Sequence, residues 1–143
     1  MRVHTLASCF VAGALLLAAC TTGGGAASPT SPTPAPIGPR PSSPAVLKIV
    51  SPKNGATVPG TGSELVVSLS KATLTAVTSQ NISPDEGHLH VSVDDRLISM
   101  TSGLRQELPP LEPGRHVIQV EFVAADHLPF DPRVLTRAEF EVR

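Results

Sequence analysis

Residues 88–100 read HLHVSVDDRLISM, two short runs of alternating side chains on either side of two aspartates. Because successive side chains of a strand point to opposite faces, the first run gathers one leucine and two valines on one face and two histidines on the other. The Asp94-Asp95 pair suits a two-residue hairpin turn. We therefore predict an antiparallel hairpin, in which a regular register pairs Leu89 with Met100 and turns Met100 into the core.

Similar alternation, bounded by Gly, Pro, Asn and Asp, recurs on both sides of this hairpin, whereas helical periodicity is weak. The pattern predicts an all-β domain, a seven-stranded antiparallel sandwich with strands at 46–50, 64–70, 88–93, 96–100, 104–108, 115–123 and 134–142. Its predicted core consists of Leu65, Val67, Leu69, Leu89, Val91, Val93, Ile118, Val120, Phe122 and Phe140.

Two segments resemble the bacterial immunoglobulin-like domains. Residues 49–58 (IVSPKNGATV) are similar to the opening strand and turn of those domains, and residues 111–120 (LEPGRHVIQV) to the start of their penultimate strand. The resemblance covers most of residues 46–143 and implies an immunoglobulin-like sandwich, but it implies no catalytic residue. The chain departs from antibody-type members because it has no Trp, no Tyr and no cysteine pair in this region.

The composition of the whole chain limits its partners. Its 143 residues suit one folded domain, and 11 basic against 12 acidic residues give a net charge of −1. Nucleic acid is therefore not an expected partner, since there is no basic excess to contact a phosphate backbone. The only aromatic residues are four Phe, so the chain also lacks the stacking platforms that bind single strands.

Residues 1–19 predict a lipoprotein signal peptide. A positive start precedes an apolar run, residues 6–19, that is shorter than the roughly 20 residues of a membrane-spanning helix. Residues 17–20 (LAAC) resemble the lipobox of bacterial lipoproteins, which implies that Cys20 becomes an acylated N-terminus in the cell membrane or the outer membrane. An ordinary secretory signal that adjoins a cysteine is the alternative. Cys9 lies in the removed segment, so the mature chain is expected to lack a free thiol.

Residues 20–45 predict a tether between this anchor and the domain. They are rich in Pro, Gly, Ser and Thr, carry Arg40 as their only charge, and cannot bury a core. Such a segment reaches at most about 70 Å, so we expect the domain, residues 46–143, to stand off the membrane on its extracytoplasmic side. The alternative for this segment is a proline-rich ligand for a partner protein.

Three histidines of the domain predict a metal site. His88 and His90 share a strand face about 7 Å apart, and His127 follows the strand 115–123 closely enough to return beside His88. Because neutral imidazoles bind copper and zinc, we expect copper or zinc at these three residues, on the solvent face. A blue-copper centre is excluded because it needs a thiolate. His116 points inward by strand parity and is expected to be structural.

The same histidines allow a second interpretation. A His-x-His pair on a strand is often solvated or hydrogen-bonded, and His127 beside Asp126 is able to pin a loop without a metal. The domain is then a structural or protein-interaction module with an envelope protein as partner. Residues 87–94 and 125–129 do resemble uncharacterised envelope domains that combine a Gly-His-x-His strand with an Asp-His-x-Pro loop, but those domains have no settled activity.

An enzyme is not expected. The chain has no nucleophile elbow, no His-Glu-x-x-His helix and no glycine-rich phosphate loop. The segment from Lys71 to Gly87 is long for a connection in a compact domain, which favours a functional loop at this end of the sandwich. Its alternating Ala72, Leu74 and Ala76 leave open a further strand instead.

Overall fold

The computed structural model describes residues 38–60 and 62–143. The predicted signal peptide, the predicted lipidation site Cys20 and most of the predicted tether lie outside the described residues. In the described part every regular element is a strand, and no helix there is long and apolar enough to cross a membrane. The strands are β1 (Val46–Ser51), β2 (Ala56–Val58), β3 (Glu64–Ser70), β4 (Thr73–Leu74), β5 (Glu86–Val93), β6 (Arg96–Thr101), β7 (Arg105–Glu107), β8 (Gly114–Ala124) and β9 (Pro129–Val142).

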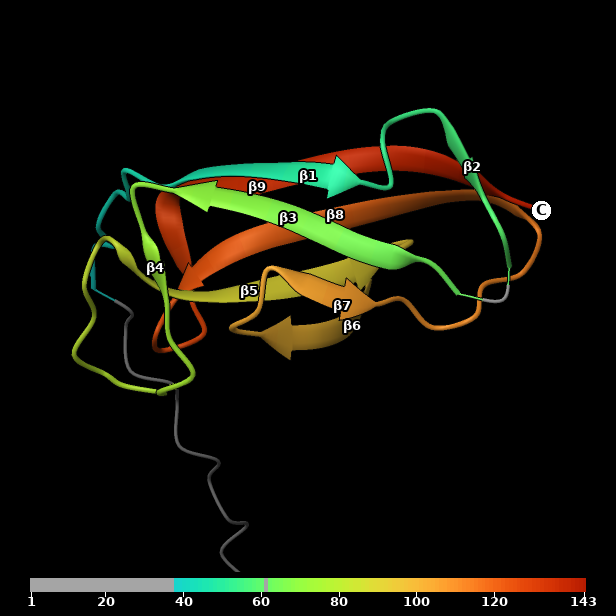
Figure 1. The fold of residues 1–143 in the computed structure, drawn as a ribbon. Helices are drawn as coiled ribbons and strands as arrows, with labels where there is room; N and C mark the ends of the chain where they lie inside the picture. The colour runs from blue at the N-terminus through green and yellow to red at the C-terminus, as the bar shows by residue number, and fades with distance from the viewer. Residues whose placement is uncertain (1–37, 61) are drawn as a thin grey trace, which may run out of the picture. The chain divides into compact units, whose positions relative to one another are not determined.

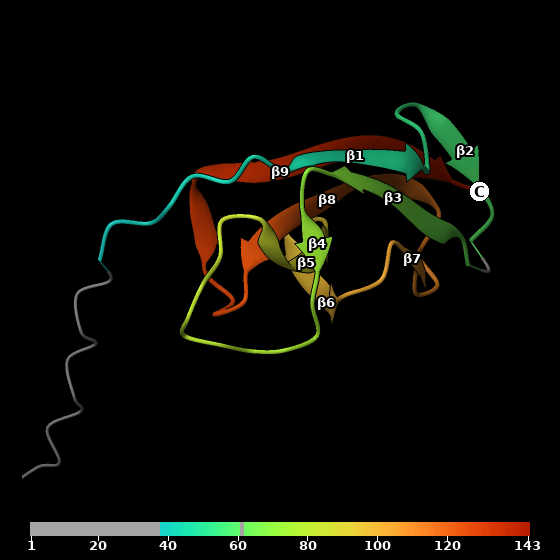
Figure 2. The same cartoon turned by 60° about the vertical axis from the view of Figure 1, so that its left-hand side comes forward.

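The strands form two sheets that lie one over the other (Figures 1 and 2). The smaller sheet has the order β1-β3-β7, and the larger has the order β2-β9-β8-β5-β4, with β6 also paired to β5. The predicted all-β class is confirmed, and each of the seven predicted strands forms. Two short strands, β2 and β4, pair in parallel with β9 and β5 and were not predicted as such. The arrangement is therefore three strands against six.

The core lies between the two sheets. The predicted core residues are buried, except Leu69, which is only partly buried at the margin. Phe130 lies in a stretch where no strand is predicted, yet it is 1% exposed and stacks on Phe122 with ring centroids 5.4 Å apart. Because burial of such a side chain stabilises a fold by roughly 1.5 to 3 kcal/mol, Phe130 fixes the start of β9 against the end of β8.

The β5–β6 hairpin turns at the two predicted residues but has an irregular register. Asp94 and Asp95 have φ of 50° and 63°, as a type I′ turn requires at both central positions. A bulge then shifts the pairing so that His90, and not Leu89, lies opposite Met100. The predicted burial of Met100 was therefore wrong, since one extra residue reverses the face of every later side chain. Met100 is 57% exposed.

Gly87 determines how closely β5 approaches β8. A Cβ atom at this position would lie 1.9 Å from the carbonyl oxygen of Val123 and 3.2 Å from the ring of Phe122. Only glycine fits such a contact with a neighbouring backbone. Gly87 thus fixes the position of the next residue, His88, relative to β8.

Candidate metal centre

The three predicted histidines come from one strand and one turn. His88 and His90 lie on β5, and His127 lies in the turn between β8 and β9, which closes through hydrogen bonds from the His127 amide to the Ala124 carbonyl (2.9 Å) and from the Ala124 amide to the Leu128 carbonyl (3.1 Å). The φ of His127 is 65°, in the left-handed region that favours glycine. The contacts of this turn therefore have to offset a backbone cost of about 1 to 2 kcal/mol at His127.

The imidazole nitrogens of these residues converge. Nε2 of His88 lies 2.7 Å and Nε2 of His90 lies 3.3 Å from Nδ1 of His127. Ligand atoms of all three lie within 4.8 Å of one another. A tetrahedral ion with metal–nitrogen bonds of about 2.0 to 2.1 Å places its ligands about 3.3 Å apart. The structure therefore brings all three residues together at a spacing that suits one ion.

The centre is more enclosed than expected. His88 is only 5% exposed and His90 is half-buried, so the predicted solvent face was wrong for His88. The connection between β4 and β5 lies over the cluster: the Thr78 hydroxyl shares a 3.1 Å hydrogen bond with Nε2 of His127, and the Ser79 amide donates to the Ala125 carbonyl at 3.0 Å. A cavity of about 150 Å³ remains beside His88 and His127.

The surroundings of His88 and His90 disfavour the charged forms of both imidazoles. Burial, together with repulsion from His127 and His90, lowers the pKa of His88 to about 4, against an opposing effect of Asp126. Burial and then His127 also lower the pKa of His90, and Glu121 opposes that shift. Both imidazoles are neutral at pH 7, and neutral imidazole is the form that binds metal.

The nearest carboxylates are already engaged. Arg40 donates two hydrogen bonds to Asp126, at 2.6 and 2.9 Å, and others to the carbonyls of Leu128 (3.1 Å) and Pro129 (2.9 Å). Arg133 binds both oxygens of Glu121, which is 6% exposed. Among the described residues, no acid joins the histidines in a cluster of ligand atoms. The donor set is therefore neutral.

His116 lies on β8, beside the turn that follows β5, at the end of the sandwich away from the three histidines. Its contacts agree with the predicted structural role. Its Nδ1 lies 2.7 Å from Oδ2 of Asp94, and its Nε2 donates to the Glu112 carbonyl at 2.8 Å. Both ring nitrogens are thus occupied. The ring also packs against Phe140 with centroids 5.9 Å apart, so His116 joins the β5–β6 turn to the core.

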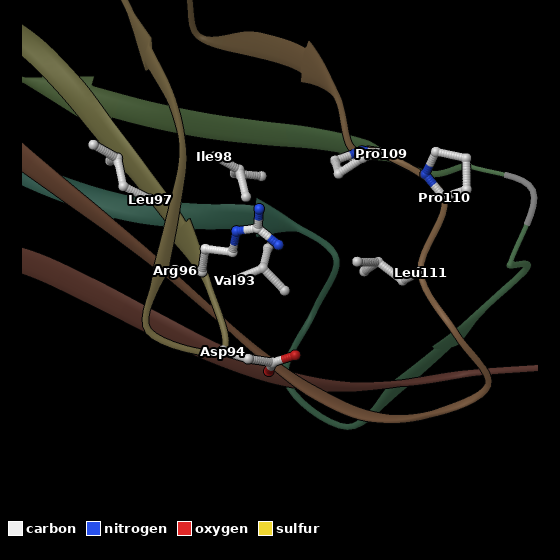
Figure 3. Close-up of a pocket in the computed structure, with 8 residues that line it drawn as sticks. All are labelled: Val93, Asp94, Arg96, Leu97, Ile98, Pro109, Pro110 and Leu111. Atoms are coloured by element: carbon white, nitrogen blue, oxygen red, sulfur yellow. The ribbon is translucent and has the colours of Figure 1, made fainter. Parts of the chain in front are cut away.

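A larger cavity of about 600 Å³ lies at this same end (Figure 3). Its lining is mainly apolar, and Figure 3 shows the Arg96 guanidinium between these side chains. The apolar residues are Val93, Leu97, Ile98, Pro109, Pro110 and Leu111. Because Asp94 is its only carboxylate and already pairs with His116, the cavity holds no second group of convergent ligands.

Sequence reasoning missed three neighbours of the histidines. Met100 was assigned to the wrong face, Thr78 lies in a segment left open, and Arg40 was placed in the tether. One signal for Arg40 was present, because it is the single charge in residues 20–45.

No family model matches the chain, and no curated protein matches it. Some solved structures are similar over part of it. An engineered protein aligns with 69% of this chain and 20% of its own, at 12% identity and a TM-score of 0.47. The fibronectin(III)-like modules of Clostridium thermocellum CbhA align over 68% of this chain and 94% of theirs, at 12% identity and a TM-score of 0.45. Neither likeness transfers a function.

Proposed function

We propose that this chain is a lipid-anchored protein of the bacterial envelope whose immunoglobulin-like sandwich is a non-catalytic, metal-binding module. His88, His90 and His127 bind Cu(II) or Zn(II), with water or another oxygen ligand completing the shell. The observation that carries this function is the convergence of three imidazole nitrogens from two separate elements within 4.8 Å. A neutral imidazole nitrogen of this kind is a common ligand of both ions.

The presence of three histidines favours a metal site over a hydrogen bond that only holds the loop in place. Nδ1 of His127 is approached by Nε2 of both His88 and His90, yet a neutral ring nitrogen has either one hydrogen or one lone pair. It can therefore satisfy only one of the two. A hydrogen bond that only holds the loop in place needs one partner for His127. One metal ion, in contrast, accepts the lone pairs of all three imidazole nitrogens at once.

Isothermal titration calorimetry with Zn(II) and Cu(II) tests the metal site. The full chain in detergent carries Cys9→Ser and Cys20→Ser, so that no thiol competes for the ion. We expect binding of one ion, weakened at least tenfold by His88→Ala, His90→Ala or His127→Ala and unchanged in the control His116→Ala. Unchanged binding in all three variants, or no uptake by the parent chain at micromolar concentration, would show that the site does not exist.

The anchor is proposed on separate grounds, the similarity of residues 17–20 to a lipobox. Lipidation of Cys20 places the module on the extracytoplasmic side of the cell membrane or the outer membrane, where we propose an envelope protein as its partner. Mass spectrometry of the mature N-terminus from a bacterial host tests this assignment. Cys20→Ala is expected to abolish acylation and membrane fractionation, and a variant that keeps the same acyl mass contradicts it.

A further inference from the structure

A thioether lies on the same face of the sheet as the histidine cluster. The bulge at Ile98 of β6 places Met100 directly opposite His90, and directly opposed side chains have Cβ atoms only about 4.5 to 5.5 Å apart on one face. Met100 also lines the 150 Å³ cavity that contains His88 and His127. Register and cavity thus place Met100 beside all three imidazoles.

Burial does not explain this position. Met100 is 57% exposed, so its side chain contributes little to the core, whereas the regular register would have buried it. The other residues around the cavity, Thr75, Ala76, Thr78, Thr101 and Ser102, are small or carry hydroxyl groups. Among these lining residues the thioether of Met100 is the one soft donor besides the imidazoles.

The net charge of the ligands distinguishes between an ion with one positive charge and an ion with two. Three neutral imidazoles and a thioether supply no negative charge, and the neighbouring carboxylates of Asp126 and Glu121 are neutralised by Arg40 and Arg133. A partly buried ion without an anionic ligand is less costly when it carries one charge than when it carries two. Thioether ligands select the soft ion Cu(I), and imidazole also suits copper.

We propose, resting on the metal-binding function above, that this centre also holds copper as Cu(I), and that Met100 then supplies the fourth ligand in place of the oxygen ligand. His88, His90 and His127 provide the three nitrogen ligands, and the sulfur of Met100 closes the site from the β6 side. Zinc binds to the three histidines alone and gains nothing from the sulfur.

Anaerobic competition with bicinchoninate measures the Cu(I) affinity of the full chain carrying Cys9→Ser and Cys20→Ser. The matched variant is Met100→Leu, which keeps side-chain volume and hydrophobicity. We expect it to lower Cu(I) affinity at least tenfold while leaving Zn(II) affinity, measured against a chromophoric chelator, within twofold. X-ray absorption should detect a sulfur ligand on Cu(I) in the parent chain and none in Met100→Leu.

A relocation control separates the position of the sulfur from its presence. The double variant Leu97→Met, Met100→Leu keeps one thioether on β6 but moves it toward the β5–β6 turn, and it should not restore Cu(I) affinity. The inference is overturned if Met100→Leu binds Cu(I) within twofold of the parent chain while His88→Ala still loses metal. If His88→Ala and the parent chain behave alike with every ion, the histidine centre itself fails, and the role of Met100 fails with it.

Discussion

Nε2 of His88 lies 2.7 Å from Nδ1 of His127, although 39 positions separate the two residues. His88 lies on the interior strand β5, next to Gly87, a position with no room for a side chain. His127 lies in a turn, with a backbone conformation that favours glycine. The backbone on both sides is specialised to bring two imidazoles together. This relationship leads to a prediction in which stability and binding change in opposite directions.

Replacement of His127 by glycine should relieve the backbone and remove the ligand. A non-glycine residue at φ of 65° costs about 1 to 2 kcal/mol. His127→Gly should therefore have a free energy of unfolding about 1 kcal/mol higher than His127→Ala, and both should lose metal binding. Urea denaturation without metal, followed by calorimetry with Zn(II), measures the two effects. Equal stability of the two variants would show that the turn carries no strain.

Removal of Arg40 should destabilise the turn that bears His127. The side chains of Arg40 and Asp126 are 16% and 7% exposed, and a carboxylate left without its partner at such a site costs about 1 to 3 kcal/mol. Arg40→Ala should lower the free energy of unfolding by that amount in urea denaturation. The control is Arg105→Ala, whose exposed pair with Glu64 contributes at most about 1 kcal/mol. Equal losses in the two variants contradict a structural role for Arg40.

The His116–Asp94 pair should make stability depend on pH. The Glu112 carbonyl and then Asp94 raise the pKa of His116, so this stabilisation is complete below pH 6.5 and declines as pH rises through the folded-state pKa. Burial opposes ionisation of Asp94, but hydrogen bonds from the Val117 amide and His116 lower its pKa, so that stabilisation declines as pH falls below 3.8.

The pair should therefore contribute most between pH 3.8 and 6.5. Urea denaturation of the parent chain and His116→Ala at several pH values gives the difference in unfolding free energy. We expect this difference to be largest near pH 6 and to shrink toward pH 9. A difference that stays constant from pH 6 to pH 9 would mean that only the packing of His116 on Phe140 contributes.

Val91→Asp should unfold the domain. Val91 is fully buried between the sheets, and an unpaired buried carboxylate costs several kcal/mol against a total stability of about 5 to 15 kcal/mol. Circular dichroism at 25 °C should show loss of the β signal. The control Val50→Asp places the same charge at an exposed position of β1 and should melt close to the parent chain. A Val91→Asp chain that melts like Val50→Asp contradicts the strand assignment.

The local pattern of the sequence was enough to predict seven of the nine strands, the Asp94-Asp95 turn and most of the core. Alternation fixes which side chains share a face, and the connection from β8 to β9 is short enough that His127 has to return beside β5. The convergence of the three histidines follows from those two facts. The position of His127 also depends on the connectivity of the sandwich, which pairs the end of β8 with the start of β5.

The features that sequence reasoning missed depend on contacts between distant segments. The bulge beside Val91 depends on how β6 packs, and no residue in the hairpin marks it, so Met100 was assigned to the wrong face. The burial of His88 comes from the β4–β5 connection folding over it. Arg40 pairs with a carboxylate 86 positions away, and composition alone assigned that residue to the tether.

The clamp between Arg40 and Asp126 also fixes where the segment before β1 meets the domain. Arg40 is fastened to the turn that carries His127, and the Asp131 amide donates to the Pro41 carbonyl at 3.0 Å. The segment therefore enters the sandwich at the end that holds the three histidines, and a change of conformation around Arg40 reaches the histidine centre through this turn.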